Sequence, residues 1–310
     1  MKLRMPLLAL AAVGCAEPWP EPPPVDAVAF AEEHEVWRLD RAEKTVTPPS
    51  GPLLWVGLWD LPEHEVTFGS SESADIRMPA EDAPPMAGTL RRRGEDVELT
   101  PAPGSPIALF EGDVVEAPTV LRHDRMEDPT RLQLGSLGLR VHSERGTDRL
   151  WLRAWDEDHP EIETFELPDY YPIDPGWRVQ ARLETYPEPV IIRVPDVTGG
   201  TVEYTAPGEL VFEHEGREHR LIATATETST SYFVMIWDST ATIDTYQGGR
   251  YVRPALVDEE GWTTIDFNRT YNAPCVFTAF SVCALPPRAN WLTFAVSAGE
   301  KRPDKLPDPN

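Results

Sequence analysis

Residues 131–156 read RLQLGSLGLRVHSERGTDRLWLRAWD, and their pattern indicates the fold class. Apolar runs at 132–134, 137–141 and 150–155 are separated by short segments that contain Gly, Ser and Asp, residues that favour turns. Short strands at such close intervals are typical of a β-sandwich or barrel rather than an α/β fold.

Similar runs extend in both directions from this stretch. We expect further strands at 53–59, 65–68, 74–78, 96–99, 107–110, 114–115, 177–183, 190–194, 201–204, 209–213, 219–224 and 232–237. We expect one helix, at residues 25–42, with a loose apolar face that consists of Val28, Phe30, Val36, Trp37 and Leu39. We therefore predict a mainly β protein with a β-sandwich-like first lobe, a second antiparallel β lobe and one short N-terminal helix.

The distribution of proline and charge predicts how these lobes are divided. The 33 prolines favour many short elements joined by turns, because proline disrupts helices and central strands. A proline- and acid-rich region at 156–175 links the two lobes. We expect a signal peptide with a lipobox at 1–15, a Pro-rich linker at 16–24, the helix and first lobe at 25–158, the second lobe at 159–302, and a disordered tail at 303–310.

The first residues have the layout of a secretory signal peptide. Lys2 and Arg4 precede a short apolar run at 5–13, which is too short to span a bilayer as a helix. The run ends at Cys15 and resembles a bacterial lipobox, in which the cysteine is acylated; ordinary cleavage after Ala16 is the alternative. We expect an exported protein, lipid-anchored in the cell envelope, with the prolines of 16–24 as an extended spacer.

The net charge restricts the possible partners. At -24, the chain would be repelled by a nucleic-acid backbone and by anionic lipid. We expect no nucleic acid, and contact with a membrane only through the lipid anchor. The remaining partners are an unidentified small ligand or an envelope component.

The segment 68–155 resembles a forkhead-associated domain faintly, through a loop that begins at Gly69. Such domains bind phosphopeptides, but here Ser70 replaces the usual arginine, and no Ser-x-x-His follows. The resemblance implies a related sandwich shape without phosphothreonine chemistry. Phosphopeptide binding would need an exposed anion site near Gly69.

Unusual residues gather in the last third of the chain. They comprise Asp238, Thr240, Tyr246, Gly249, Arg250, Asp266, Phe267, Asn268, Tyr271, Asn272, Pro274, Cys275, Cys283, Pro286, Pro287, Asn290, Gly299, Glu300 and Lys301. In order and spacing these residues resemble the bacterial domain-of-unknown-function family 1684, with Ala273 in place of the first proline of a Pro-Pro pair. The resemblance implies no activity, because the function of that family is unknown.

Six of these residues form a candidate ligand or polar cluster: Arg250, Asp266, Asn268, Asn272, Glu300 and Lys301. If 265–268 is a strand, Asp266 and Asn268 share one face, and Arg250 and Lys301 are their expected partners. Two interpretations remain open. The cluster is a buried structural network, or it is a pocket in which Arg250 binds an anion while Asp266 or Glu300 acts as a base.

Cys275 and Cys283 are left as a pair once Cys15 is acylated. An exported protein favours a disulfide between them, and two buried thiols are the alternative. Neither cysteine has a CxxC partner or a nearby histidine, and the two histidines of 214–219 lie in an expected hairpin turn, so we expect no metal site. No pattern for an organic cofactor is present either.

The sequence contains no nucleophile motif such as GxSxG and no metal constellation. Our leading hypothesis is therefore a non-enzymatic envelope lipoprotein that binds a small ligand or an envelope partner. The alternative is an exported enzyme, most plausibly a hydrolase, that uses Arg250, Asp266, Asn268 and Glu300.

Overall fold

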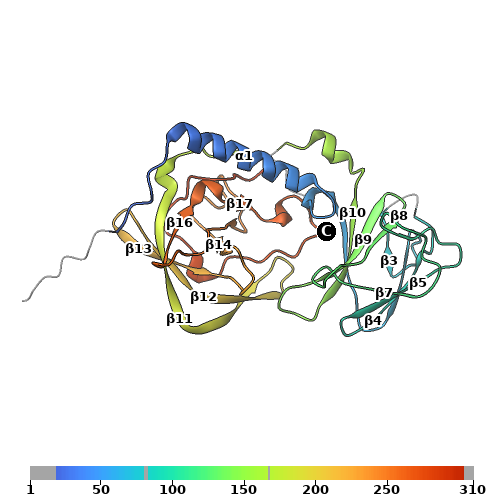
Figure 1. The fold of residues 1–310 in the computed structure, drawn as a ribbon. Helices are drawn as coiled ribbons and strands as arrows, with labels where there is room; N and C mark the ends of the chain where they lie inside the picture. Colours follow the sequence, from blue (N-terminus) through green and yellow to red (C-terminus); the bar gives the residue numbers. More distant parts are fainter. Residues whose placement is uncertain (1–18, 80–82, 167, 304–310) are drawn as a thin grey trace, which may run out of the picture.

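The computed structural model describes residues 19–79, 83–166 and 168–303. Within these residues the chain is mainly β, with one α-helix, α1 (Ala27–Val46), which confirms the predicted fold class. Figure 1 shows two β-rich lobes side by side, with α1 lying along one of them. The predicted signal peptide with Cys15 and most of the predicted tail lie outside the described residues.

The first lobe consists of two five-stranded sheets, with strand orders β1-β10-β9-β8-β6 and β3-β2-β4-β5-β7. Their bounds are β1 Trp55–Asp60, β2 Glu65–Gly69, β3 Ile76–Arg77, β4 Gly88–Arg93, β5 Asp96–Pro101, β6 Ala108–Leu109, β7 Thr119–Leu121, β8 Arg131–Leu134, β9 Leu137–Ser143 and β10 Leu150–Asp156. One apolar core contains buried side chains from both sheets, among them Leu90, Leu99, Leu139 and Leu152. A sandwich-like arrangement follows from this shared core.

The second lobe contains a four-stranded sheet, β13-β12-β11-β16, and a three-stranded sheet, β14-β15-β17. The bounds are β11 Arg178–Pro195, β12 Thr201–His214, β13 Arg217–Ala223, β14 Val234–Ile236, β15 Arg250–Val252, β16 Trp262–Asp266 and β17 Tyr271–Asn272.

Six 3-10 helices complete the described elements: η1 Pro52–Leu54, η2 Pro160–Thr164, η3 Pro175–Trp177, η4 Phe267–Arg269, η5 Pro274–Val276 and η6 Arg288–Asn290.

Strands β11 and β12 are longer than predicted. We predicted four short strands here, whereas β11 and β12 pair along most of their length in one antiparallel ribbon. The register shifts between Thr185 and Val190, and Pro187 and Pro189 lie in this irregular interval. Pro207 of β12 lies opposite the same interval. Proline lacks a backbone donor but is tolerated at such a bulge, so it does not end either strand.

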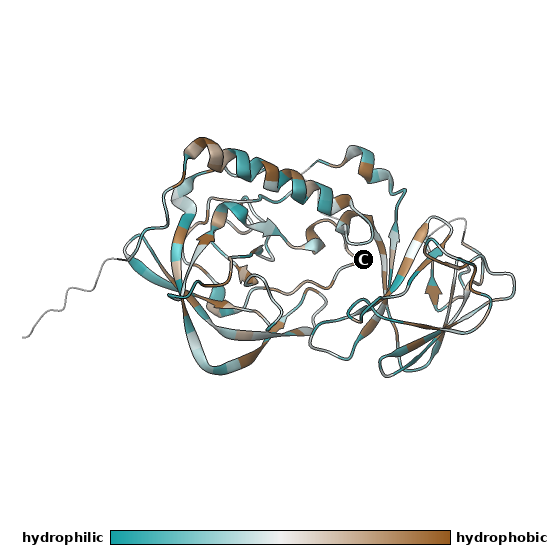
Figure 2. Ribbon diagram, viewed as in Figure 1, coloured by the Kyte–Doolittle hydropathy of each residue, from teal (hydrophilic) through white to brown (hydrophobic). Residues whose placement is uncertain are grey.

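Helix α1 begins after Asp26, whose side chain accepts hydrogen bonds from the backbone N–H groups of Val28 and Ala29. The predicted apolar face was wrong, because Val28, Val36 and Leu39 are all more than 60% exposed. Figure 2 shows hydrophilic and hydrophobic residues mixed along the helix. No helix among the described residues is long and apolar enough to cross a membrane.

Polar contacts hold α1 on the second lobe, although the predicted domain boundaries place the helix with the first lobe. His34 lies 2.8 Å from a carboxylate oxygen of Asp266 at the end of β16. The Nε of Arg41 donates to Glu300 over 3.0 Å. These long-range contacts hold the helix on the second lobe without a continuous apolar stripe.

The proline-rich segment before α1 also packs on the second lobe. The indole N–H of Trp19 donates to the carbonyl of Gln180 in β11, and its ring lies 5.6 Å, centroid to centroid, from that of Trp262. Arg178 donates to the carbonyl of Pro23. We predicted an extended spacer at 16–24, but its described residues 19–24 pack on the second lobe, because Trp19 supplies both an apolar ring and a donor.

The two lobes meet through the loop that follows η5. Thr278 donates to the carbonyl of Trp55 in β1 over 2.9 Å, and Arg153 of β10 donates to the carbonyl of Phe280 over 3.2 Å. The guanidinium of Arg153 also lies 3.8 Å from the centroid of the Trp55 ring. The first lobe is therefore joined to the part of the second lobe that carries both cysteines.

Candidate functional site

Arg250, the first residue of the predicted cluster, is buried in β15 and 1% exposed. Its guanidinium lies 2.9 Å from a carboxylate oxygen of Asp238 and donates to the carbonyls of Val296, Ala298 and Glu300. Arg250 therefore ties the C-terminal segment to β15. These carbonyls and Asp238 occupy the guanidinium, which leaves little capacity for a ligand.

Glu300 is fully buried and holds a second part of the network. One carboxylate oxygen accepts from Arg41 and from the hydroxyl of Tyr170, and the other accepts from the backbone N–H of Asn272 over 2.7 Å. The side chain of Asn272 donates to the carbonyl of Lys301. Burial and the Glu300 carboxylate raise the pKa of Tyr170 far above its usual value, so Tyr170 acts as a neutral donor. Arg41, which the sequence did not indicate, is the cation that Glu300 contacts.

Asp266 and Asn268 lie together, but not on one face of a strand as predicted. Strand β16 ends at Asp266, which caps η4 by accepting from the backbone and side-chain nitrogens of Asn268. The side chain of Asn268 also donates to the carbonyl of Asp174. The Asp-x-Asn spacing thus forms a short cap in place of two more strand residues.

His34 contacts the other carboxylate oxygen of Asp266. Its Nε2 faces that oxygen at 2.8 Å, and its Nδ1 faces the carbonyl of Phe30 at 2.7 Å. A neutral imidazole can donate to only one of them, so both contacts are hydrogen bonds only when the ring carries two protons. Burial alone would raise the pKa of Asp266, but the hydrogen bonds from His34 and Asn268 outweigh it and hold the pKa below its usual value.

The predicted disulfide was wrong, since Cys275 and Cys283 are free thiols. The sulfur of Cys283 lies 3.1 Å from the backbone N–H of Cys275, because η5 presents its backbone to that sulfur. The thiol of Cys275 lies 3.8 Å from the hydroxyl of Tyr246. The hydrogen bond with Cys283 and burial both raise the pKa of Cys275.

The structure thus brings together Arg250, Asn272, Glu300 and Lys301 through contacts around the C-terminal segment, and it pairs Asp266 with Asn268 at a separate place. The ammonium of Lys301 lies 4.9 Å from the centroid of the Tyr171 ring. Asp266 lines a shallow hollow of about 240 Å³ that Arg178, Arg253 and Arg269 also line.

Near Gly69, the hydroxyl of Ser70 donates to the carbonyl of Ala83.

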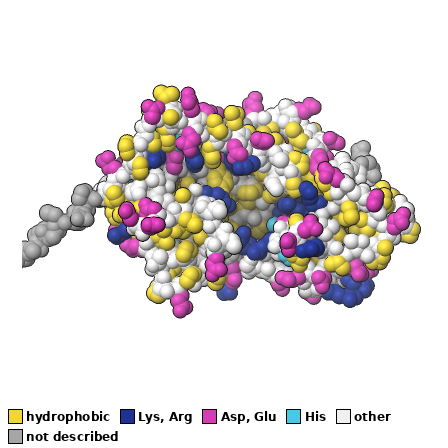
Figure 3. Space-filling view, in the orientation of Figure 1, with side chains coloured by type: hydrophobic (Ala, Val, Ile, Leu, Met, Phe, Trp, Pro, Cys, Tyr) yellow, Lys and Arg dark blue, Asp and Glu magenta, His cyan; other side chains and the backbone are white. Residues whose placement is uncertain are grey.

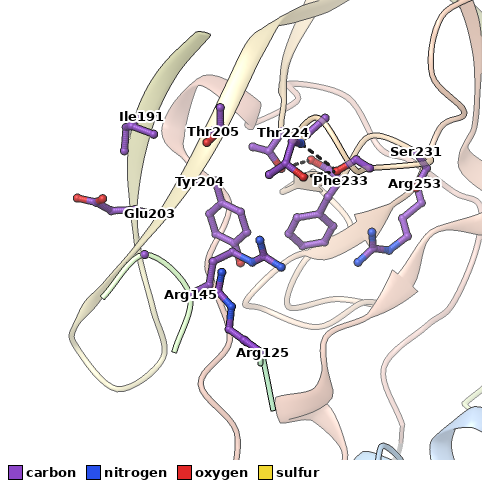
Figure 4. Close-up of a pocket in the computed structure, with 14 residues that line it drawn as sticks. Arg125, Arg145, Ile191, Glu203, Tyr204, Thr205, Thr224, Ser231, Phe233 and Arg253 are labelled. Carbon is purple, nitrogen blue, oxygen red and sulfur yellow. Dashed lines mark hydrogen bonds between the residues drawn. The ribbon is translucent and has the colours of Figure 1, made fainter. Parts of the chain in front are cut away.

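A different group of residues forms a pocket of about 380 Å³ between the two lobes. The first lobe contributes Arg125, which follows β7, and Arg145 and Gly146 at the tip of the β9–β10 hairpin. From the second lobe come Ile191, Glu203, Tyr204, Thr205, Thr224, Ala225, Thr226, Ser229, Ser231, Phe233 and Arg253. Figure 4 shows side chains from both lobes reaching into this space.

The arginine pocket, as we call this space, carries an excess of positive charge. Arg125, Arg145 and Arg253 form no ion pair with any residue that the structure describes. Glu203 is the one acid among the lining residues, and its carboxylate is already paired with Arg193 at 2.6 Å. Figure 3 shows several Lys and Arg side chains around a hollow near the middle of the face in view. An uncompensated positive pocket in a chain of net charge -24 favours an anion.

Aromatic rings form one wall of the arginine pocket. The rings of Tyr204 and Phe233 lie 5.6 Å apart, centroid to centroid, and the guanidinium of Arg253 lies 4.8 Å from the centroid of Phe233. The Nε of Arg253 donates to the hydroxyl of Tyr271, which fixes the direction of its side chain. Burial raises the pKa of Tyr204 to about 12, so its phenol stays neutral and can donate a hydrogen bond.

Gly146 determines how closely the hairpin tip approaches β12. A Cβ at this position would lie 2.4 Å from the Cβ of Glu203, and the φ of +70° is one that other residues rarely adopt. Glycine therefore lets the tip rest on β12 and places Arg145 at the edge of the pocket.

The lining residues suit binding better than acid–base catalysis. They supply guanidinium and hydroxyl donors, whereas the one lining carboxylate is paired and no histidine is among them. We did not predict this site, because its three arginines stand at positions 125, 145 and 253 in unrelated sequence contexts. No spacing in the chain indicates that they meet, so the sequence offered no signal for them.

Comparisons with known proteins give a family without an activity. Residues 163–301 match the model of DUF1684, described as a protein of unknown function. A solution NMR structure of an uncharacterised protein of Haloarcula marismortui is 31% identical, covers 46% of this chain and 80% of its own, and gives a TM-score of 0.39. No curated protein matches the chain.

Proposed function

The chain belongs to the DUF1684 family, whose function is unknown, and from that premise we propose that it binds a small organic anion in the arginine pocket. This proposal rests on three arginines that line the pocket from two lobes and that have no carboxylate partner among the described residues. Guanidinium groups bind carboxylates and phosphates through paired, charge-assisted hydrogen bonds. A pocket of about 380 Å³ falls in the range of small-molecule sites.

We place the ligand in this pocket rather than at the predicted C-terminal cluster. Arg250 and Glu300 are each bonded to several chain segments and are at most 1% exposed. The groups that would have to act on a substrate are therefore engaged in holding the chain together. The proposal is accordingly one of binding, and the hydrolase hypothesis has no independent support from the pocket.

We propose further that binding takes place outside the cytoplasm, on a body held at a membrane by the acylated Cys15. The charged start, the short apolar run and the cysteine at its end support this location. Mass spectrometry of the mature N-terminus tests it. Acylated Cys15 as the first residue is expected, and an unmodified start at Glu17 would exclude the anchor.

Binding is tested with succinate, citrate and inorganic phosphate as probes, by thermal shift and then by isothermal titration calorimetry of the purified protein. We expect at least one of these anions to raise Tm, and the stabilisation should grow with the logarithm of the anion concentration relative to its Kd. Arg145→Ala and Arg253→Ala should each weaken that binding about tenfold or more, since a hydrogen bond to a charged group contributes about 1.5–3 kcal/mol.

Arg93→Ala is the matched control, because it also removes one positive charge but lies at the exposed end of β4 in the first lobe. It should bind the probe as the wild type does. Equal losses in Arg93→Ala and Arg145→Ala would show that only net charge matters. If no anion binds, or if binding is unaffected by both pocket variants, the proposal is refuted.

A further inference from the structure

We propose that the natural ligand of the arginine pocket is a phosphate monoester that carries a planar ring. This inference rests on the proposed function and specifies its ligand. It follows from three features of the pocket: the number of unpaired guanidiniums, the side from which each one enters, and the aromatic wall between them.

The first lobe presents two arginines to one ligand. Arg125 and Arg145 both line the pocket, and neither is paired with an acid among the described residues. A single carboxylate carries one charge and two oxygens, which one guanidinium fork can satisfy. A phosphate monoester carries between one and two negative charges at pH 7 and has three free oxygens, so it can serve two forks at once.

The second lobe presents rings and a third cation. In Figure 4 the ring of Phe233 lies between Arg145 and Arg253, and the ring of Tyr204 lies next to Arg145. Their planes are inclined at 40°, and the guanidinium of Arg253 contacts the Phe233 ring. A planar group of the ligand can pack against this wall, where stacking on aromatic side chains and on arginine is favourable. Arg253 then lies near the far end of the ligand.

Hydroxyl groups also line the pocket. Thr205, Thr226, Ser229 and Ser231 all line it, and the hydroxyl of Thr226 lies 3.1 Å from that of Ser229. Such groups can donate to or accept from polar atoms on a ring or a sugar. The lining thus combines positive charge, aromatic surface and hydroxyls, which matches a phosphate joined to a planar and polar organic group.

The test is a matched set of four ligands measured by isothermal titration calorimetry at one salt concentration. Adenosine 5′-monophosphate has both parts, adenosine lacks the phosphate, inorganic phosphate lacks the ring, and terephthalate has a planar ring with two carboxylates. We expect the monophosphate to bind at least tenfold more tightly than each of the others. Arg145→Ala should weaken binding of both the monophosphate and inorganic phosphate about tenfold or more.

Phe233→Leu separates the aromatic contribution from the ionic one. It should weaken the monophosphate about tenfold, as expected for loss of a stacking partner, and change inorganic phosphate less than threefold. Arg93→Ala should leave all four affinities unchanged. If terephthalate binds as tightly as the monophosphate and with the same dependence on Arg145, the inference on phosphate fails while the proposed anion binding stands. If no ligand shows dependence on Arg145, both fail.

Discussion

Individual buried charges in this protein connect chain segments that are distant in sequence. Arg250 joins Asp238 to the carbonyls of the C-terminal segment. Glu300 contacts both Arg41 of α1 and Asn272 of β17, and so joins these two elements. Buried ions of this kind stabilise a fold only while each partner is present. Their main effect is therefore to fix the position of the C-terminal segment.

Removal of Arg250 should cost much stability. Arg250→Ala leaves the buried carboxylate of Asp238 without its cation, and we expect a loss of about 3–5 kcal/mol in the free energy of unfolding. Arg217→Ala, at an exposed position of β13, should change it by less than about 0.5 kcal/mol. Urea denaturation followed by fluorescence gives both values. A loss below 1 kcal/mol for Arg250→Ala would contradict the structural role.

Asp266 should make stability depend on pH in the acid range. Its folded-state pKa lies below 3.8, the usual pKa of an aspartate, so its stabilising effect is complete above that value and is lost as the pH falls through the lower folded-state pKa. Asp266→Asn should therefore be less stable than the wild type at pH 7, and the difference should shrink towards pH 2. Urea denaturation at pH 7, 4, 3 and 2 measures this difference. A gap that stays constant over this range would show that the carboxylate does not titrate as proposed.

Among the elements, the β9–β10 hairpin has the closest connection to the arginine pocket. Its two strands are paired along their full length, from Leu150 opposite Ser143 to Asp156 opposite Leu137. This rigid ladder carries Arg145 and Gly146 at its tip, where the tip meets β12. The hairpin therefore positions a first-lobe arginine against the second lobe.

Gly146→Ala should weaken ligand binding without removing a ligand contact. The added Cβ would collide with Glu203 and push Arg145 away from β12, and we expect an affinity loss of about fivefold or more, equivalent to about 1 kcal/mol. Gly94→Ala is the matched control, because Gly94 also has a positive φ, of 64°, but nothing within 4 Å of the added Cβ. It should lose stability only through the strain at its positive φ, and it should bind the ligand normally. Equal affinities of the two variants would contradict the positioning role.

The elements also show how far the sequence was informative. Apolar runs predicted most strands of the first lobe, and charged and apolar spacing predicted α1. Three features depended on contacts that no local pattern records. A bulge accommodates the prolines and lets β11 and β12 continue, Asp266 caps η4 instead of extending β16, and polar rather than apolar contacts hold α1. The arginine pocket was not predictable for the same reason, since Arg125, Arg145 and Arg253 meet only in the folded chain.

At the scale of the whole molecule, the two lobes are joined by few but buried contacts. Arg153 is 2% exposed, stacks on Trp55 and donates to the carbonyl of Phe280. Burial, together with the nearby Arg140, lowers the pKa of Arg153, which remains charged at neutral pH. Since the arginine pocket takes residues from both lobes, its shape depends on this joint.

Arg153→Ala should uncouple the lobes. We expect one cooperative transition for the wild type in differential scanning calorimetry, and two separated transitions for the variant, because a small interface no longer links the unfolding of two cores. The variant should also bind the ligand more weakly although Arg153 does not line the pocket. A single transition at unchanged Tm would refute the role of Arg153 in joining the lobes.

The most direct measurement is the NMR signal of the arginine side chains during titration with adenosine 5′-monophosphate. The Nε–H resonances of Arg125, Arg145 and Arg253 should shift together and saturate at one ligand concentration, while that of Arg93 stays in place. Two results would contradict a ligand site between the lobes. One is saturable shifts confined to other arginines, and the other is no shift at any ligand concentration used in the calorimetric titrations.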